Sequence, residues 1–316
     1  EQLDLEMQRR GYVGTSILPA FEVGKPSGTF GVIELASLLA NANADTRRAS
    51  NGGYAEGDYS FVDRSFQTAE HGWSERVDDR ERAVYADYFD GQSHSADEVA
   101  RDRCWEHVLH NLDKRVIEAT VDAIVAASQT TAAGTKWDVL ETAKPVDNVE
   151  AAAQEIWNRT GMWPDTLTIS RQSFKSLRRC KQILDLITSN GAGDRAMPRD
   201  VTRDKLAEVL DLRQVIVSDA IGNTANRAKA AVIESLFPKT KALLSKAAMT
   251  NDFKEPCLGR TFHWGGDGSE IRDGRMIGVV EEFRDENIRS DKIRVRHETS
   301  EFILYQEMGQ VITGIL

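Results

Sequence analysis

The strongest pattern along the chain is a helical stripe in residues 95–125. Apolar side chains recur there at helical spacing, and no Gly or Pro interrupts the run before Gly134. Ser95 and Glu98 have the spacing of a capping box, in which each side chain accepts a backbone N–H of the first turn. We therefore predict one helix of about thirty residues, roughly 45 Å long at ~1.5 Å per residue, which would act as a spine.

The segment before this helix has a different character. Gly and Pro recur too often between residues 11 and 31 for a regular helix, so we predict an extended arm there. Residues 35–44 are compatible with a short helix. Extended patterns then run from 59 to 65 and from 73 to 77, and because residues 71–72 (His-Gly) offer a turn between them, we predict a long hairpin.

The predicted hairpin carries many aromatic side chains for an irregular region. They are Tyr54, Tyr59, Phe61, Phe66 and Trp73. Aromatic residues are sparse in disordered segments, so these side chains need a surface to bury against. Either a neighbouring subunit or the body of the same chain would provide such a surface, and the sequence is compatible with both.

The middle of the chain alternates between helical and extended patterns, which predicts a small α/β lobe. Asp147 or Asn148 would cap a first helix, and Gly161 stands where a left-handed residue would end it. The other predicted elements are a strand at 166–170, a helix capped by Ser170, a helix at 202–212 and a strand at 214–217.

The C-terminal part alternates apolar and polar residues, as strands with one buried and one solvated face do. We predict strands at 277–283, 293–297, 302–306 and 310–315, which together would form a sheet. Helices and strands are thus partly segregated along the chain, and the predicted fold class is α+β.

The composition limits the class of protein. The 316 residues are 41% hydrophobic and 28% charged, as in soluble globular proteins, and no apolar run reaches the ~18 residues of a membrane span. A net charge of −10 argues against tight wrapping of nucleic acid, which needs clustered Lys and Arg. Three widely spaced cysteines fit neither a disulfide framework nor a zinc site, so we expect a reducing compartment such as the cytosol.

No group of residues stands out as an active site. His107 and His110 lie one helical turn apart, but no third metal ligand follows at a recognised spacing. Residues 263–268 resemble a phosphate loop only in their glycines, because the Walker lysine and serine are missing. The acidic pairs at 281–282 and 285–286 fall in a predicted turn, where a solvated patch is the ordinary explanation. We predict a protein that is not an enzyme and has no cofactor or metal.

The order of these parts resembles that of tailed-phage major capsid proteins with the Hong Kong 97-like fold, along nearly the whole chain. Residues 68–77 (TAEHGWSERV) are similar to the segment that returns from that family's extended loop, and residues 113–116 (DKRV) to its spine-helix signature. Residues 261–264 (TFHW) and 309–312 (GQVI) occupy the places of its late strands. The entry to its axial domain is matched by Trp137, Pro145, Val149, Gly161, Pro164, Leu167, Ile169, Phe174 and Leu177.

The resemblance implies five parts. They are an N-terminal arm (1–40), an extended loop (41–92), the spine helix of a peripheral domain (93–136), an axial domain (137–274) and peripheral-domain strands (275–316). It also implies a homo-oligomeric shell of hexamers and pentamers, in which the extended loop of one subunit lies over its neighbour. The side chains that we predict to make inter-subunit contacts are Tyr59, Phe61, Phe66, Trp73 and Arg76.

The setting implied by the resemblance is a virion. Such a shell is assembled in the host cytoplasm, matures from a precursor, encloses double-stranded DNA by weak non-specific contact, and works with scaffold, portal and decoration proteins. A hinge at residues 52–53 (Gly-Gly) would let the extended loop move.

Two other functions agree with the same pattern. An encapsulin-like shell has the same fold but holds a protein cargo, so the contents of the shell would distinguish it. An α/β enzyme whose long helix links two domains belongs to a different class, and a compact monomer that forms no particles would support it.

Overall fold

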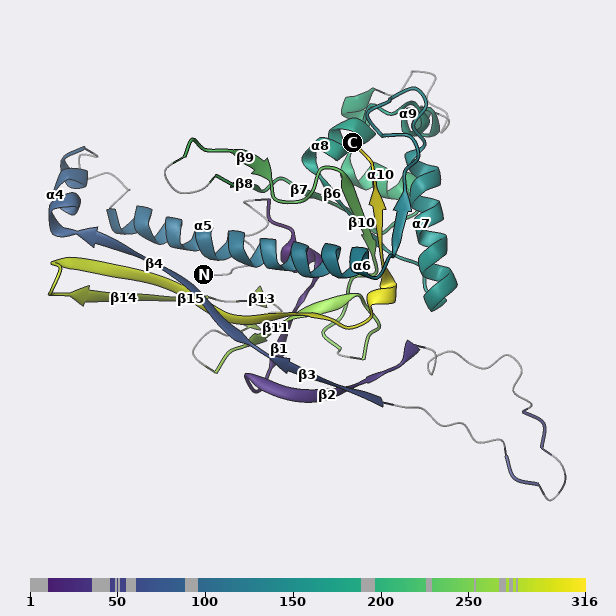
Figure 1. Ribbon diagram of the computed structural model, residues 1–316, viewed down its shortest axis with the longest axis horizontal. Coiled ribbons are helices and arrows are strands. Elements are labelled where there is room, and N and C mark those ends of the chain that lie inside the picture. The colour runs from purple at the N-terminus through teal and green to yellow at the C-terminus, as the bar shows by residue number, and fades with distance from the viewer. Residues whose placement is uncertain are drawn as a thin grey trace.

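The computed structural model describes residues 11–35, 46–48, 50, 52–54, 61–88, 96–188, 197–225, 229–252, 254–266, 271–272, 275–276 and 278–316. Figure 1 shows two main sheets beside one long helix, with a two-stranded ribbon as a sheet of its own. The predicted helix at 35–44, apart from its first residue, and the capping residue Ser95 lie outside the described residues. No helix of the described part is both long and apolar enough to cross a bilayer.

The long helix is confirmed. It consists of α5 (Ala96–Ile117), one π-helical stretch (Glu118–Asp122) and α6 (Ala123–Ala126), which follow one another without a break. At the start of the π-helical stretch the Thr120 hydroxyl donates to the carbonyl of Val116 at 2.7 Å, and a side chain that bonds back in this way competes with the regular ladder. Most of the apolar stripe of the helix is buried, and Val99 and Val125 near its two ends are partly buried.

One sheet packs on this helix. Its longest strand, β15 (Ser290–Ile303), pairs antiparallel with β4 (Ala69–Asp78), with β14 (Val279–Asp285) and with β11 (Gly259–Trp264). The short β1 (Ala20–Val23) runs parallel to β11 at the edge. Successive residues of a strand point to opposite faces, so the odd-numbered residues of β4 from 71 to 77 share the face that lies on α5.

The predicted turn at His71 and Gly72 is wrong. Both residues lie within β4, where they pair with His297 and Arg296. The predicted strand at 73–77 does not pair with the one predicted at 59–65. Its hydrogen-bonding partner is β15, more than two hundred residues further along the chain. The antiparallel ribbon is formed instead by β2 (Ser27–Ile33) and β3 (Phe61–Gln67).

Replacing Gly72 by Val is expected to destabilise the fold by about 1–3 kcal/mol, the usual cost of overpacking. A Cβ at this position would meet the Val295 carbonyl oxygen at 2.9 Å and the Arg296 Cβ at 3.0 Å, so the two strands would have to separate. Urea unfolding would measure the loss, with Ser74→Val on the same exposed face of β4 as the control. Equal stability of the two variants would contradict this account.

The second sheet is the centre of an α/β lobe, as predicted, but two of its strands come from outside the predicted residues 137–274. Its strand order is β5 (Thr130–Ala132), β16 (Gly309–Thr313), β10 (Lys241–Ser245), β6 (Thr166–Ser170) and β7 (Gln214–Ser218). The helices beside it are α7 (Pro145–Thr160), α8 (Arg171–Leu177), α9 (Lys181–Thr188) and α10 (Arg203–Val209).

Most of the predicted helix ends in this lobe are confirmed. Ser170 caps α8 by accepting the Ser173 N–H, and Gly161 ends α7 with a left-handed φ of 69°. The predicted cap at Asp147 or Asn148 is wrong, because α7 begins at Pro145. A proline fits the first turn of a helix, where its missing N–H would have no partner.

The prediction of one C-terminal sheet is also wrong. The stretch predicted at 293–297 and the first two residues of the stretch predicted at 302–306 belong to the single strand β15, and a 3₁₀ turn (Gln306–Met308) follows. After this turn β16 enters the second sheet, between β5 and β10. Four consecutive residues of β16 are buried, which is the pattern of a central strand covered on both faces.

Two hydrophobic clusters meet at the second sheet. One lies against α7 and includes Leu244 of β10 and Ile312 of β16, whereas the other lies against α5 and includes their chain neighbours Leu243 and Val311. Adjacent residues of the same strands thus belong to different clusters, and the sheet lies between the two clusters and contributes one face to each.

The N-terminal arm is tied to the long helix. The backbone N–H groups of Val13 and Gly14 both donate to Asp113 Oδ1, at 2.8 Å and 2.5 Å, and Asp113 is fully buried. Burial raises the pKa of this carboxyl to about 6, although the two backbone N–H groups oppose the shift. The arm is extended as predicted, apart from the four-residue helix α2 (Gly14–Ile17).

Candidate subunit-contact surfaces

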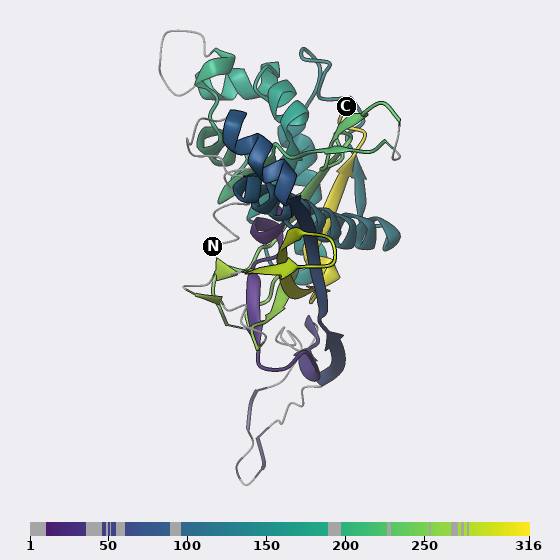
Figure 2. The ribbon, with the colours of Figure 1, turned by 90° about the vertical axis from the view of Figure 1, so that its left-hand side faces the viewer.

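The β2–β3 ribbon is a sheet of its own that runs along the edge of the first sheet and beyond it, as the two views show (Figures 1 and 2). Its cross-strand pairs run from Ser27 and Gln67 at the base to Ile33 and Phe61 at the far end. Most of its side chains are exposed or half-buried. Because an isolated two-stranded ribbon is marginally stable in water, this one needs support at its base and cover along its length.

Four phenylalanine rings support the base. The Phe66 ring centroid lies 5.1 Å from that of Phe262 and 5.9 Å from that of Phe30. Phe30 in turn lies 5.1 Å from Phe302 in an edge-on arrangement, and each such pair adds about 0.5–1.5 kcal/mol beyond the buried area. Phe66 is thus packed within its own subunit here, and its role between subunits stays a prediction.

The far end of the described ribbon is only partly covered within the subunit: Val32 is buried against Leu304, and the Ile33 carbonyl accepts a hydrogen bond from the Tyr305 hydroxyl at 2.8 Å, but other side chains are exposed. Phe61 is 56% exposed, and its neighbour Val62 is 38% exposed. Large exposed apolar side chains that lie together are typical of surfaces that meet a partner. Tyr59, the nearest predicted contact residue in the sequence, lies outside the described residues.

Trp73 and Arg76 lie on β4, away from the described end of the ribbon, and on opposite faces of that strand. The Trp73 ring stacks on His107 of α5 with centroids 4.2 Å apart, yet 46% of the side chain remains exposed. Arg76 is exposed on the other face, where its register partner is Lys292. The structure therefore places the described contact candidates in two regions, and it does not test their contacts.

The face of the sheet that carries Arg76 is rich in charge. Lys292, Arg294 and Arg296 of β15 lie on it at alternate positions. Glu281 of β14 pairs with Arg296 at 2.9 Å and also with Arg294, and hydrogen bonds from these two residues, Arg294 first, lower its pKa. Of the acidic residues predicted here in a turn, Glu281, Glu282 and Asp285 therefore lie on β14, where Glu281 is paired, and only Glu286 lies in the turn that follows.

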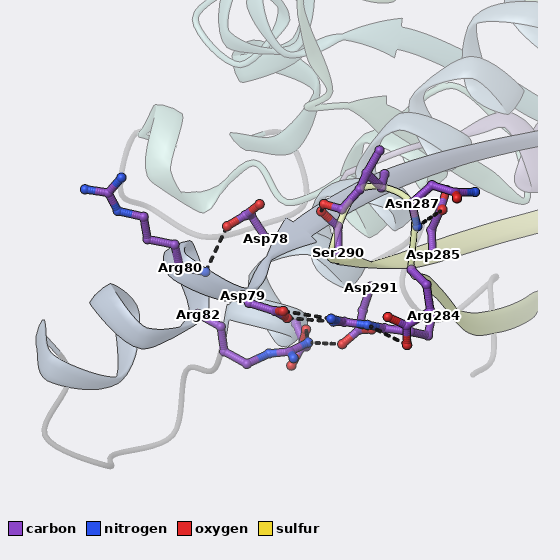
Figure 3. A network of polar contacts seen from close by, with 12 residues as sticks. Asp78, Asp79, Arg80, Arg82, Arg284, Asp285, Asn287, Ser290 and Asp291 are labelled. Carbon is purple, nitrogen blue, oxygen red and sulfur yellow. Dashed lines mark hydrogen bonds and ion pairs between the residues drawn. The ribbon is translucent and has the colours of Figure 1, made fainter.

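A network of arginines and aspartates joins the end of this sheet to two helices (Figure 3). Arg284 makes two hydrogen bonds to Asp79 of α4 (Asp79–Tyr88), at 2.6 Å and 2.7 Å. Arg82 of α4 lies between Asp291, at 2.6 Å, and Asp97 of α5, at 2.7 Å. The sequence analysis did not predict this network, because its partners are far apart in the chain.

The same network limits cation binding. Within the described ranges, carboxylate oxygens of Asp97, Glu282 and Asp291 come within 4.8 Å of one another, as metal ligands do. Two of these carboxylates, however, already balance the guanidinium of Arg82. The closeness of these carboxylates is thus explained by the ion pairs of Arg82, which join the end of the sheet to α5.

The two histidines singled out in the sequence have different ring contacts. His107 lies under Trp73, whereas His110 lies beside Tyr12, with ring centroids 6.4 Å apart, and beside Gly222. His263 is a fully buried residue of β11, so residues 263–268 begin inside a sheet.

The cysteines have the properties of core residues. Cys104, Cys180 and Cys257 are all buried and free. Burial raises the pKa of Cys104 and of Cys257 to about 11, and it raises that of Cys180 as well. At neutral pH all three are therefore thiols, and the thiolate that nucleophilic catalysis needs is not formed.

A second exposed apolar surface lies on the β8–β9 hairpin (Ile221–Asn223 and Ile233–Ser235). Ile221 is 61% exposed and Ile233 is 68% exposed, and the register places them on the same face of the hairpin. The opposite face, with Gly222, lies on His110 of α5. Sequence reasoning missed this hairpin, although two isoleucines near Gly and Asn residues are a signal for it.

Comparison with known proteins gives matches of structure. No protein-family model matches the chain, and no curated protein matches it. A solved phage-related protein from Bordetella bronchiseptica RB50 is 17% identical, with a TM-score of 0.65, over 96% of this chain and 92% of that one. A structure from Microbacterium phage Oxtober96 is 13% identical, with a TM-score of 0.58, over 96% and 91%.

A further match is the SrpI encapsulin of Synechococcus elongatus PCC 7942. It is 11% identical, with a TM-score of 0.54, over 95% of this chain and 86% of that one. Each of these likenesses spans nearly the whole of both chains, so the agreement concerns the complete arrangement of arm, ribbon, helix and sheets.

Proposed function

We propose that this chain, which has the Hong Kong 97-like fold, is a shell-forming structural protein and specifically the major capsid protein of a tailed phage. The observation that carries the proposal is the β2–β3 ribbon, which is fixed at its base by phenylalanines and exposes Phe61 and Val62 at its far end. A ribbon of this kind gains stability by lying on another subunit.

The proposed shell is icosahedral and consists of hexamers and pentamers of this one chain. Many copies of a modest contact, closed by symmetry, give a stable particle. The net charge of −10 supports weak, non-specific contact with enclosed double-stranded DNA, because strong binding needs clustered cations that release phosphate counterions. Scaffold, portal and decoration proteins and a maturation step belong to the same proposal.

The structure gives the enzyme alternative little support. The three cysteines are buried thiols, and two carboxylates of the cluster Asp97, Glu282 and Asp291 form ion pairs with Arg82. We therefore propose that the chain is not an enzyme. The encapsulin alternative is favoured by one observation, the whole-chain likeness to a solved encapsulin.

Electron microscopy of the purified chain tests the proposal. We expect closed particles of uniform size, and a compact monomer on size-exclusion chromatography without particles would overturn it. Particles isolated from the cells that naturally contain the chain then distinguish the two kinds of shell. Nuclease-protected double-stranded DNA inside them supports the capsid, whereas a protein cargo without DNA supports the encapsulin-like shell.

A further inference from the structure

Several ionisable side chains are gathered where β4 pairs with β15. His71 and His297 are directly opposite each other in the strand register, and their ring centroids are 6.0 Å apart. Arg115 of α5 reaches the same place, with its Nη2 atom 3.3 Å from His297 Nε2. His297 is only 1% exposed, and the fully buried His263 of β11 adds a third imidazole to the group.

The contact between Arg115 and His297 requires a neutral histidine. A guanidinium carries only hydrogen-bond donors, so His297 Nε2 must accept. A proton on that nitrogen would turn the acceptor into a donor that points at another donor. It would also place a second positive charge 3.3 Å from the first, inside the protein.

The negative charge that balances the group is itself sensitive to acid. Glu301 of β15 contacts Arg115 at 3.2 Å, and its side chain is 12% exposed. Burial raises the pKa of Glu301, although Arg115 opposes the shift. As the pH falls, Glu301 therefore loses its charge at a higher pH than a free glutamate does. Thr299, which accepts a hydrogen bond from Arg115 at 3.1 Å, carries no charge.

The opposite face of the same strand pair carries two carboxylates. Glu70 and Glu298 are directly opposite each other there, and like charges in this position repel. Glu70 is exposed, so water screens this repulsion. The buried face with Arg115 therefore dominates the effect of pH.

We propose that His71, His297 and Arg115 form an acid-sensitive contact that holds β4 to β15 at neutral pH and releases β4 when the pH falls. The device lies within one subunit and does not depend on assembly into a shell. Thr68 alone separates β4 from β3 in the chain, so release of β4 would loosen one side of the ribbon at its base.

The direction of the pH dependence follows from the two states. Burial, and then the nearby Arg115, lowers the pKa of His71 to about 4, and the same causes hold the pKa of His297 well below 6.5. In the released strand the pKa of His71 would return to about 6.5, and that of His297, which stays on β15 but is no longer covered by β4, would move towards the same value. Between these values the released state binds more protons, so the closed state loses stability as the pH falls from about 6.5 towards 4.

Hydrogen–deuterium exchange of the full chain tests the proposal. After correction for the intrinsic effect of pH on exchange, we expect the opening of residues 69–77 to rise at least about tenfold from about pH 7 to about pH 5, since one pKa unit is tenfold. Opening of α7, which is distant from the group, should not rise with it. An unchanged opening of β4 in the wild-type chain would overturn the proposal.

The double variant His71→Gln, His297→Gln removes the titrating groups but keeps an acceptor for Arg115. We expect the opening of its β4 to rise much less from about pH 7 to about pH 5 than in the wild type, because only Glu301 of the group still titrates, and the same acid response as in the wild type would overturn the proposal. His110→Gln is the control, because this histidine faces β8, and it should respond as the wild type does. If the double variant does not fold, titration of the wild-type imidazoles by NMR decides, and ordinary pKa values near 6.5 for both would refute the device.

Discussion

Replacing residues 34–60 by the dipeptide Asn-Gly is expected to leave a folded subunit that no longer forms closed shells. Ile33 and Phe61 are paired in the ribbon, so a two-residue type I′ turn can join them without a change of register. The new chain keeps the phenylalanine base and both sheets. It loses the segment through which, under the proposed function, one subunit reaches the next.

The stability of this variant should equal or exceed that of the parent chain, because a short loop costs less entropy to close. Thermal unfolding and electron microscopy of the same preparation measure the two effects separately. A matched control shortens the other exposed hairpin, with Asn-Gly in place of residues 224–232 between the paired Asn223 and Ile233. Closed particles of normal size from the ribbon variant would contradict the proposed role of the segment.

Replacing Leu112 by Ala is expected to lower the free energy of unfolding by about 2–5 kcal/mol. Leu112 is fully buried in the cluster between α5 and the sheets, so the change removes apolar contacts and leaves a cavity. Alanine is at least as good a helix former as leucine, so the loss would come from packing and not from α5 itself.

Urea unfolding of the unassembled subunit measures the effect of this change. Leu186→Ala is the matched control, because Leu186 is also helical but 44% exposed, and its loss should be well under half as large. If the two variants unfolded at the same urea concentration, the buried face of α5 would have been assigned wrongly.

Local signals in the sequence were enough for the elements whose partners are close by. The helical stripe of α5, the serine cap of α8 and the left-handed Gly161 each depend on residues within a few positions of one another. The alternation in β3 and β4 was also visible, but an alternating strand pairs equally well with any strand of matching pattern. Its partner is selected by tertiary contacts such as Phe66 with Phe262.

The residues of the candidate surfaces also differ in whether they could be predicted from the sequence. Exposed aromatic residues such as Phe61 and Trp73 could be selected from the sequence, because their region held more aromatic side chains than a loop needs. The pair Arg284–Asp79 could not, since 205 positions separate the two residues. The acid-sensitive group likewise joins α5 to strands near opposite ends of the chain.

The position of the second sheet between the two hydrophobic clusters has a consequence for how the subunit is synthesised and folds. Strand β16 supplies Val311 to one cluster and Ile312 to the other, and it follows every other described strand in the chain. Neither cluster can close during translation until this strand has left the ribosome. Because such distant contacts also slow folding, subunits should become able to associate only after synthesis has passed β16.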